Sequence, residues 1–260
     1  MNNFLHAIKA EWITGRRTFL RYSPILLAIL PLILSFLIVS TLIKNNIGTP
    51  LLMDVAQKYI SINLMSLKSF VPLYCVLIAY YSFHREHTYK LWKHINVQPV
   101  SGSVQMLTKH FYTWCYLAIT LIMLFVLIPL GLLVIKLIYS SVNTELNDPN
   151  FLSACCQFGV EILITGISIV SILNVISARF SSHMIVFLTG TAGAFWSQTK
   201  SISNHTDVID QFIPWTIGNL FYQQFSKAIV GESWWIIIPF IWIAAGLAVH
   251  MVLQKKRPLY

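Results

Sequence analysis

The stretch FYTWCYLAITLIMLFVLIPLGLLVIKL, residues 111–137, decides the fold class of this chain. It carries one charged side chain, Lys136, and exceeds the roughly 20 apolar residues that a helix needs to cross a bilayer core of about 30 Å. Over all 260 residues, 56% are hydrophobic and 10% are charged, against about 25% charged in an ordinary soluble domain. Because so few charged residues could not keep the surface of a soluble domain hydrated, the sequence predicts a helical membrane protein.

Five further apolar segments flank this one. The fifth span in chain order is short and contains Gly190, Gly193 and Ala194, so we expect it to pack closely against another helix. The sixth begins at Trp234-Trp235, an aromatic pair typical of membrane interfaces. The predicted fold class is an all-α membrane protein with one transmembrane domain over residues 1–260. Its six expected spans are about 23–43, 63–83, 111–137, 156–178, 184–199 and 233–253.

The basic residues predict the orientation. An even number of spans places both termini on one side of the membrane. Twelve of the 18 Lys and Arg residues then lie in segments on that side, and four lie in segments on the other. Because cytoplasmic loops carry the excess of Lys and Arg, both termini and loop 84–110 are predicted to be cytoplasmic. This also accounts for the net charge of +9 without a nucleic-acid partner.

The N-terminal segment 3–14 has the pattern of a short basic amphipathic helix. One helical face is apolar, and His6, Lys9 and Glu11 lie elsewhere around the helix. Such a helix is expected to lie on the inner surface of the membrane. Its apolar face consists of Phe4, Leu5, Ile8 and Trp12.

Segment 200–232, expected outside, is aromatic but too interrupted to span the membrane. Pro214 and Gly218 break any helix that the apolar residues could form. We therefore expect a re-entrant or interfacial segment, surrounded by protein where its backbone is irregular. The candidates for an outer gate are Phe212, Pro214, Trp215 and Phe221.

The chain lacks the patterns of a nucleotide-binding or catalytic site. G-x-x-x-x-G-K-[ST] and H-E-x-x-H are both absent, and the four cysteines include no C-x-x-C. None of the eight histidines pairs with a carboxylate at a convincing ligand spacing inside a span. We therefore expect no catalytic residue, no metal site and no cofactor on this chain.

Two ionisable residues of opposite sign lie inside expected spans. Lys68 and Glu161 are each about five residues from the outer end of their span, roughly 7–8 Å deep at a rise of about 1.5 Å per residue. Intramembrane charges are costly and are usually paired or functional. Three interpretations stay open: an ion pair, separate solvation with Lys68 extending outward, or direct contact with a substrate.

The cytoplasmic loop has the most distinctive pattern. Residues 83–110 read FHREHTYKLWKHINVQPVSGSVQMLTKH. They predict a short amphipathic helix from about Glu86 to His94, a stop at Pro99, a turn at Ser101-Gly102 and a cap at Ser103 for the next span. A rigid helix between two spans would move both when a partner pushes it.

This loop resembles that of the ABC-2 type permeases. In that family an acidic residue ends the second span, and a Thr-x-Lys element, an apolar pair, Pro-Val-Ser and a lysine follow. Here the corresponding residues are Glu86, Thr88, Lys90, Leu91-Trp92, Pro99-Val100-Ser101 and Lys109. The resemblance, which covers the six-span layout, implies a transport subunit that works with a second permease chain, as heterodimer or homodimer, and with two copies of a separate ATPase that binds ATP and Mg.

The loop helix is expected to contact that ATPase. The chain lacks a nucleotide motif and has a stiff basic loop, as expected of a protein that receives movement from another protein. The residues expected to couple to the ATPase are Glu86, Tyr89, Lys90, Trp92, Lys93 and Pro99.

Within the family, the chain is most similar to the small permease subunits of lantibiotic immunity transporters. The similarity rests on Arg85-Glu86-His87 and Ile213-Pro214-Trp215. It implies export of an antimicrobial peptide from the plasma membrane of a bacterium. The following residues, Thr216-Ile217-Gly218, do not match one subfamily, so an exporter of another drug, lipid or ion stays open. An intramembrane enzyme and a passive membrane scaffold are the alternatives of another class.

Overall fold

The computed structural model describes residues 2–15, 22–45, 55–88, 101–139, 149–180, 182–203, 212–217 and 237–255. The secondary structure in these ranges is helical, without a strand, and confirms the predicted all-α class. The helices, in chain order, are α1 (Asn2–Gly15), α2 (Ser23–Asn45), α3 (Val55–Thr88), α5 (Gly102–Ile138), α6 (Pro149–Arg179), α7 (His183–Ser203) and α9 (Ile237–Lys255).

Among the described residues, four helices have the length and composition needed to cross a membrane. The qualifying stretches are Ser23–Lys44, Val55–Phe83, Gly102–Ile138 and Cys155–Arg179, in α2, α3, α5 and α6. Helix α9 contains a shorter apolar stretch, Ile237–Val252. The structure therefore supports a polytopic membrane protein, and the assignment of α7 and α9 as fifth and sixth spans stays a prediction.

Helices α3 and α5 extend further than the expected spans. Helix α3 continues without a break through Thr88, and α5 begins at Gly102, where the Ser101 carbonyl accepts the amides of Val104 (3.0 Å) and Gln105 (3.2 Å). Ser101, not Ser103, therefore occupies the N-cap position. The connection between the helices is residues 89–101 instead of the expected loop 84–110. Hydropathy detects the apolar part of a helix, whereas backbone hydrogen bonding continues into polar residues.

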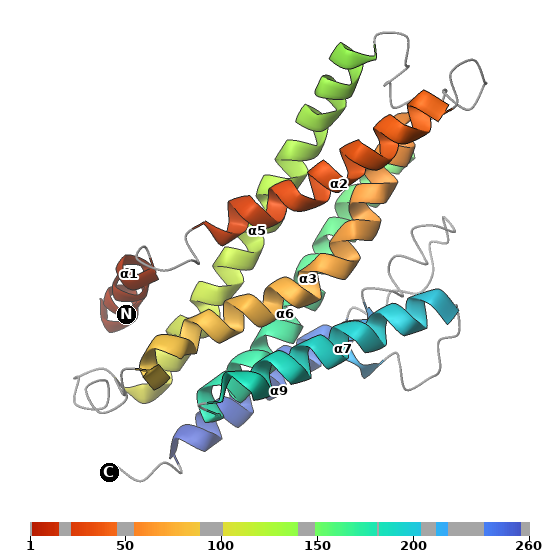
Figure 1. Ribbon diagram of the computed structural model, residues 1–260. Helices are drawn as coiled ribbons and strands as arrows, with labels where there is room; N and C mark the ends of the chain where they lie inside the picture. Colours follow the sequence, from red (N-terminus) through yellow and green to blue (C-terminus); the bar gives the residue numbers. More distant parts are fainter. Residues whose placement is uncertain are drawn as a thin grey trace.

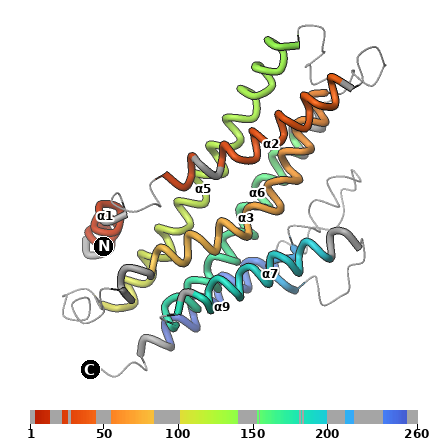
Figure 2. The backbone as a smooth tube through the Cα atoms, in the orientation of Figure 1, coloured from red at the N-terminus to blue at the C-terminus, as the bar shows by residue number. Residues whose placement is uncertain are grey.

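The helices form an elongated bundle in which α3 is central (Figure 1). Helix α3 packs against α2, α5, α6 and α7, and α6 packs against α9 as well. Helix α1 lies beside α5 at the end of the bundle where α9 finishes (Figure 2). We call this the terminal end; the C-terminal end of α3 and the N-terminal end of α5 also lie there (Figure 1).

Buried hydroxyl and amide groups join the apolar helices. Tyr74 on α3 lies between two hydroxyls, with its Oη 2.7 Å from Thr120 Oγ1 on α5 and 3.3 Å from Ser23 Oγ on α2. Ser35 Oγ on α2 donates to Asn63 Oδ1 on α3 at 3.0 Å. Polar side chains between helices are favoured in a membrane because lipid offers them no partner. These bonds fix the register of α2, α3 and α5.

Small residues let α7 approach its neighbours, as the sequence predicted. A Cβ atom at Gly190 would lie 2.1 Å from Val76 Cγ2 on α3, and one at Gly193 would lie 2.6 Å from the Trp215 ring. Both distances are far below van der Waals contact. Helix α7 therefore meets α3 and the 212–217 segment at positions where any side chain would displace a neighbour.

Gly190→Ala tests this close contact. The added methyl group overlaps the β-branched Val76, whose side chain has few alternative rotamers. We expect the melting temperature in detergent to fall, because the free energy of unfolding should decrease by about 1–3 kcal/mol. Combining the change with Val76→Ala should restore much of the loss. Ala192→Val adds bulk on the exposed side of the same helix and should have little effect. Equal stability of the Gly190 and Ala192 variants would contradict the close contact.

Candidate coupling site

The sequence-predicted coupling residues lie in and after the last turn of α3. Glu86 is in α3, two residues before its end at Thr88. The other five, Tyr89, Lys90, Trp92, Lys93 and Pro99, lie outside the described residues. The geometry around the two ends of the 89–101 connection is nevertheless defined, because α3 and α5 are described up to Thr88 and from Ser101.

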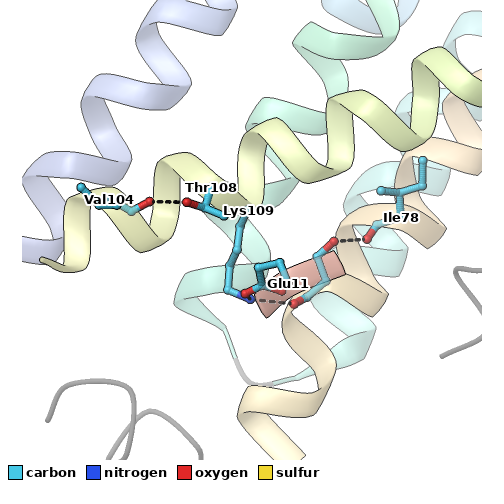
Figure 3. A network of polar contacts seen from close by, with 6 residues as sticks. Glu11, Ile78, Val104, Thr108 and Lys109 are labelled. Atoms are coloured by element: carbon cyan, nitrogen blue, oxygen red, sulfur yellow. Dashed lines mark hydrogen bonds and ion pairs between the residues drawn. The ribbon is translucent and has the colours of Figure 1, made fainter. Parts of the chain in front are cut away.

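Lys109 on α5 joins three helices at the terminal end. Its Nζ lies 3.0 Å from Glu11 Oε1 on α1 and donates to the Ser82 carbonyl on α3 at 3.2 Å (Figure 3). The same Nζ is 5.2 Å from the centroid of the Phe83 ring. The lysine side chain is 5% exposed and the glutamate 27%. A buried ammonium needs such partners, because an unpaired charge away from water is costly. We call Glu11, Ser82, Phe83 and Lys109 the coupling site.

Neighbouring hydroxyls bond to their own helices. Ser82 Oγ donates to the Ile78 carbonyl at 2.7 Å, and Thr108 Oγ1 donates to the Val104 carbonyl at 2.8 Å (Figure 3). Serine and threonine satisfy their hydroxyls in this way inside apolar helices. Lys109 therefore binds the backbone carbonyl of Ser82, whose hydroxyl is already bonded within α3.

Aromatic contacts on both sides of the ion pair hold α1 against α5. The Phe4 ring meets Phe111 edge-on at 6.2 Å between centroids. The Trp12 ring lies 6.2 Å from Tyr112 and 5.7 Å from Tyr116. Two residues of the expected apolar face, Phe4 and Trp12, thus contact protein, whereas Leu5 is 58% exposed. The position of α1 on a membrane surface stays a prediction.

A comparison with protein-family models matched residues 7–193 to the ABC-2 family transporter proteins. The match covers most of the chain, from within α1 through α2, α3, α5 and α6 to Gly193 in α7. The chain belongs to the ABC-2 transporter family. A comparison with curated proteins found no match. ABC-2 permeases are membrane transport subunits, generally not catalytic themselves, that normally work with an ABC ATPase.

In this ABC-2 protein, the coupling site links the two helices on either side of the 89–101 connection. Lys109 contacts α3 directly through Ser82 and Phe83, so one side chain joins the C-terminal part of α3 to the N-terminal part of α5. Glu11 adds α1 to the same contact. The sequence identified Lys109 only as a position in the family pattern and placed Glu11 on the polar face. The one sequence signal that could have indicated the ion pair is that Glu11 is the single carboxylate in the N-terminal segment 3–14.

Lys68 and Glu161 of this ABC-2 protein are both buried between packed helices. Cys75 Sγ on α3 donates to the Gly166 carbonyl on α6 at 3.5 Å, and both helices run toward the terminal end. Counting back along each helix from this contact places Lys68 and Glu161 at depths that differ by about 3 Å.

Helices α3 and α6 both begin before the spans expected for them, so Lys68 and Glu161 are further from the helix starts than from the expected span starts. The two positions are about 20 Å and about 18 Å from the helix starts. The predicted depth of roughly 7–8 Å below the outer membrane edge stays a prediction. Glu161 Oε1 accepts a hydrogen bond from Gln157 Nε2 at 2.9 Å. Direct pairing of Lys68 with Glu161 stays a prediction.

Three of the four outer-gate candidates of the ABC-2 chain lie on a short helical segment, residues 212–217, between α7 and α9. Pro214 is buried, Trp215 packs against Gly193 on α7, and Phe212 is exposed. Trp242 Nε1 on α9 donates to the Phe212 carbonyl at 2.8 Å. Phe221 lies outside the described residues. The segment is thus attached to both neighbouring helices, and its gating role stays a prediction.

Proposed function

We propose that this ABC-2 protein is the transmembrane permease subunit of an ATP-driven exporter in a bacterial plasma membrane. The observation that carries the proposal is the position of Lys109 on α5, which binds α3 through the Ser82 carbonyl and α1 through Glu11, close to the 89–101 connection. An ATPase that pushes this connection would move α3 and α5 together. ATP and Mg would be held by two copies of the ATPase, and a second permease chain would complete the transporter.

The orientation follows from the same proposal. Helices α7 and α9 have 21 and 19 residues, so each is about 30 Å long and could cross the bilayer core. With α2, α3, α5 and α6 they would give six spans, which would put both termini on one side of the membrane. The excess of Lys and Arg in the segments on that side supports the cytoplasm. The coupling site and the 89–101 connection would then face the ATPase.

The proposed substrate is a lantibiotic-type antimicrobial peptide. Support comes from Arg85-Glu86-His87 and Ile213-Pro214-Trp215, which resemble elements of immunity transporters. The exposed Phe212 and the aromatic 212–217 segment suit an amphiphilic ligand that arrives from the outer leaflet. Export of another drug, lipid or ion is the alternative within the same family.

Purification and a resistance assay test this proposal. Chain tagged at its C-terminus should copurify with an ABC ATPase from its native membrane. Cells that express both proteins should tolerate several-fold more of a lantibiotic than cells with a Walker-A mutant of the ATPase. Resistance to an unrelated drug but not to the peptide would support the alternative substrate. Resistance that persists with the mutant ATPase would contradict the transporter itself.

Glu86→Gln tests the predicted contact with the ATPase. The change keeps the size of the side chain and removes the charge that we expect to face the partner. Export should fall about tenfold or more, while the amount of protein in the membrane stays the same. Glu145→Gln, the same change in the loop expected outside, is the matched control and should be silent. Full export by the Glu86 variant would contradict the coupling role.

A further inference from the structure

A chain of buried polar side chains begins one residue beyond Lys109 and reaches α6 and α9. His110 Nε2 on α5 lies 2.9 Å from His250 Nδ1 on α9. Asn174 Nδ2 on α6 lies 3.3 Å from His110 Nδ1 and donates to Thr113 Oγ1 at 3.0 Å. His110, Asn174 and His250 are all at most 3% exposed. We call these three residues the histidine bridge.

The hydrogen bonds of the histidine bridge have one direction. Asn174 Nδ2 donates one N–H to Thr113 and presents the other to His110 Nδ1, which then accepts. His110 must therefore carry its proton on Nε2 and donate it to His250 Nδ1. Each residue has one defined role, so the bridge specifies one arrangement of α5, α6 and α9.

Phe83 connects the histidine bridge to the coupling site. Its ring is buried at the end of α3, 5.2 Å below Lys109 Nζ and with its centroid 6.2 Å from that of the His250 ring. One side chain thus contacts both the ammonium that binds α1 and the imidazole carried by α9. Movement of α3 against α5 must displace Phe83 and with it His250.

Helix α9 extends from the histidine bridge to the 212–217 segment. His250 lies near its C-terminal end, and Trp242, about 12 Å earlier along the axis, donates to the Phe212 carbonyl. Between them, Gly246 packs directly on the backbone of Ser171 on α6. Most other large side chains of α9 are exposed, including Ile237, Phe240, Ile241, Val249 and Val252.

We propose that His250 is a positioning residue that transmits movement from the coupling site through α9 to the 212–217 segment. This inference rests on the proposed function and adds a path for it: Lys109, Phe83, His110–His250, then Trp242 and Phe212. The bridge makes α9 follow α5, and the indole hydrogen bond makes the outer segment follow α9. Transport then requires the bond at His250, while ATP hydrolysis on the partner does not.

Two substitutions of equal shape isolate the hydrogen bond. Asparagine places an amide group near the position of imidazole Nδ1, so His250→Asn can keep the bond to His110. Leucine has nearly the same shape as asparagine but no polar group, so His250→Leu removes the bond. A second pair, His110→Gln and His110→Met, applies the same comparison at the Nε2 position of the other ring.

The readout is the accessibility of position 212 in the assembled transporter with its ATPase. The four native cysteines are replaced by alanine, Phe212→Cys is introduced, and labelling by a membrane-impermeant maleimide is measured with and without a non-hydrolysable ATP analogue. We expect the nucleotide to change the labelling rate at position 212 in the parent protein, which retains His250, and in the His250→Asn variant. The change should be lost in His250→Leu, and export of a fluorescent lantibiotic should fall about tenfold at unchanged ATP hydrolysis.

The outcomes separate this inference from the proposed function. A full nucleotide response in His250→Leu, while the parent protein responds, would overturn the role of His250 and leave the proposed function standing. Equal loss in the asparagine and leucine variants, in proportion to a lower amount of protein, would also overturn it in favour of a purely structural role. A parent protein that neither responds to nucleotide nor exports would overturn both.

Discussion

Lys109→Met should abolish export while the partner ATPase continues to hydrolyse ATP. Methionine retains most of the length of the lysine side chain but removes the ammonium that binds Glu11 and the Ser82 carbonyl. The ends of α3 and α5 then lose their direct polar contact, and α1 loses its ion pair. We expect at least a tenfold loss of peptide resistance, measured in cells and normalised to the amount of protein in the membrane.

Lys136→Met is the matched control for this change. Lys136 lies on the same helix, near its other end, and its side chain is exposed. Glu11→Gln should be milder than Lys109→Met, because Lys109 keeps Ser82 and Phe83 and because the glutamate is partly exposed to solvent. Adding Glu11→Gln to Lys109→Met should have little further effect. Wild-type resistance in Lys109→Met cells would show that the contact does not transmit movement.

Lys68→Met and Glu161→Gln should each impair folding or export, and the double variant should recover part of the loss. Both residues are buried, on helices α3 and α6, at depths that differ by about 3 Å. Removing one member of a buried pair leaves the other charge uncompensated, which typically costs about 3–5 kcal/mol. Removing both avoids this penalty, so the two effects should not add.

A double-mutant cycle decides between pairing and independent roles. Membrane level and resistance are measured for the parent, both single variants and the double variant. Additive losses would contradict the pair and favour Lys68 and Glu161 acting separately, one solvated and the other on the substrate path. Gln157→Leu serves as a control, because it removes the hydrogen-bond donor to Glu161 on the same helix without changing a charge.

The helical membrane class of this protein is readable from the chain alone. A run such as 111–137 has no stable place in water, and only a helix can satisfy its backbone inside lipid, so composition and length suffice to predict it. The family pattern from Glu86 to Lys109 is also local and needs no structure. The close packing of α7 followed from Gly190 and Gly193, because a missing side chain is itself a sequence feature.

The C-terminal end of α3 and the N-terminal end of α5 were predicted less accurately than the membrane class. The apolar pattern stops where the membrane stops, whereas a helix continues as long as its backbone hydrogen bonds do. This is why α3 includes Glu86 and why α5 begins at Gly102, nine residues before the expected span.

Only the tertiary structure decided which polar residues meet. Glu11, Ser82 and Lys109 come from three helices, and His110, Asn174 and His250 come from three, with α5 common to both groups. Local patterns describe one face of one helix, so they show that a residue is polar but not which partner it has. That choice depends on how each helix is rotated and how far it slides against its neighbours, and a shift of one residue turns a side chain by about 100° around the helix axis. The membrane class is therefore a property of each segment, whereas the coupling site exists only once the helices have packed.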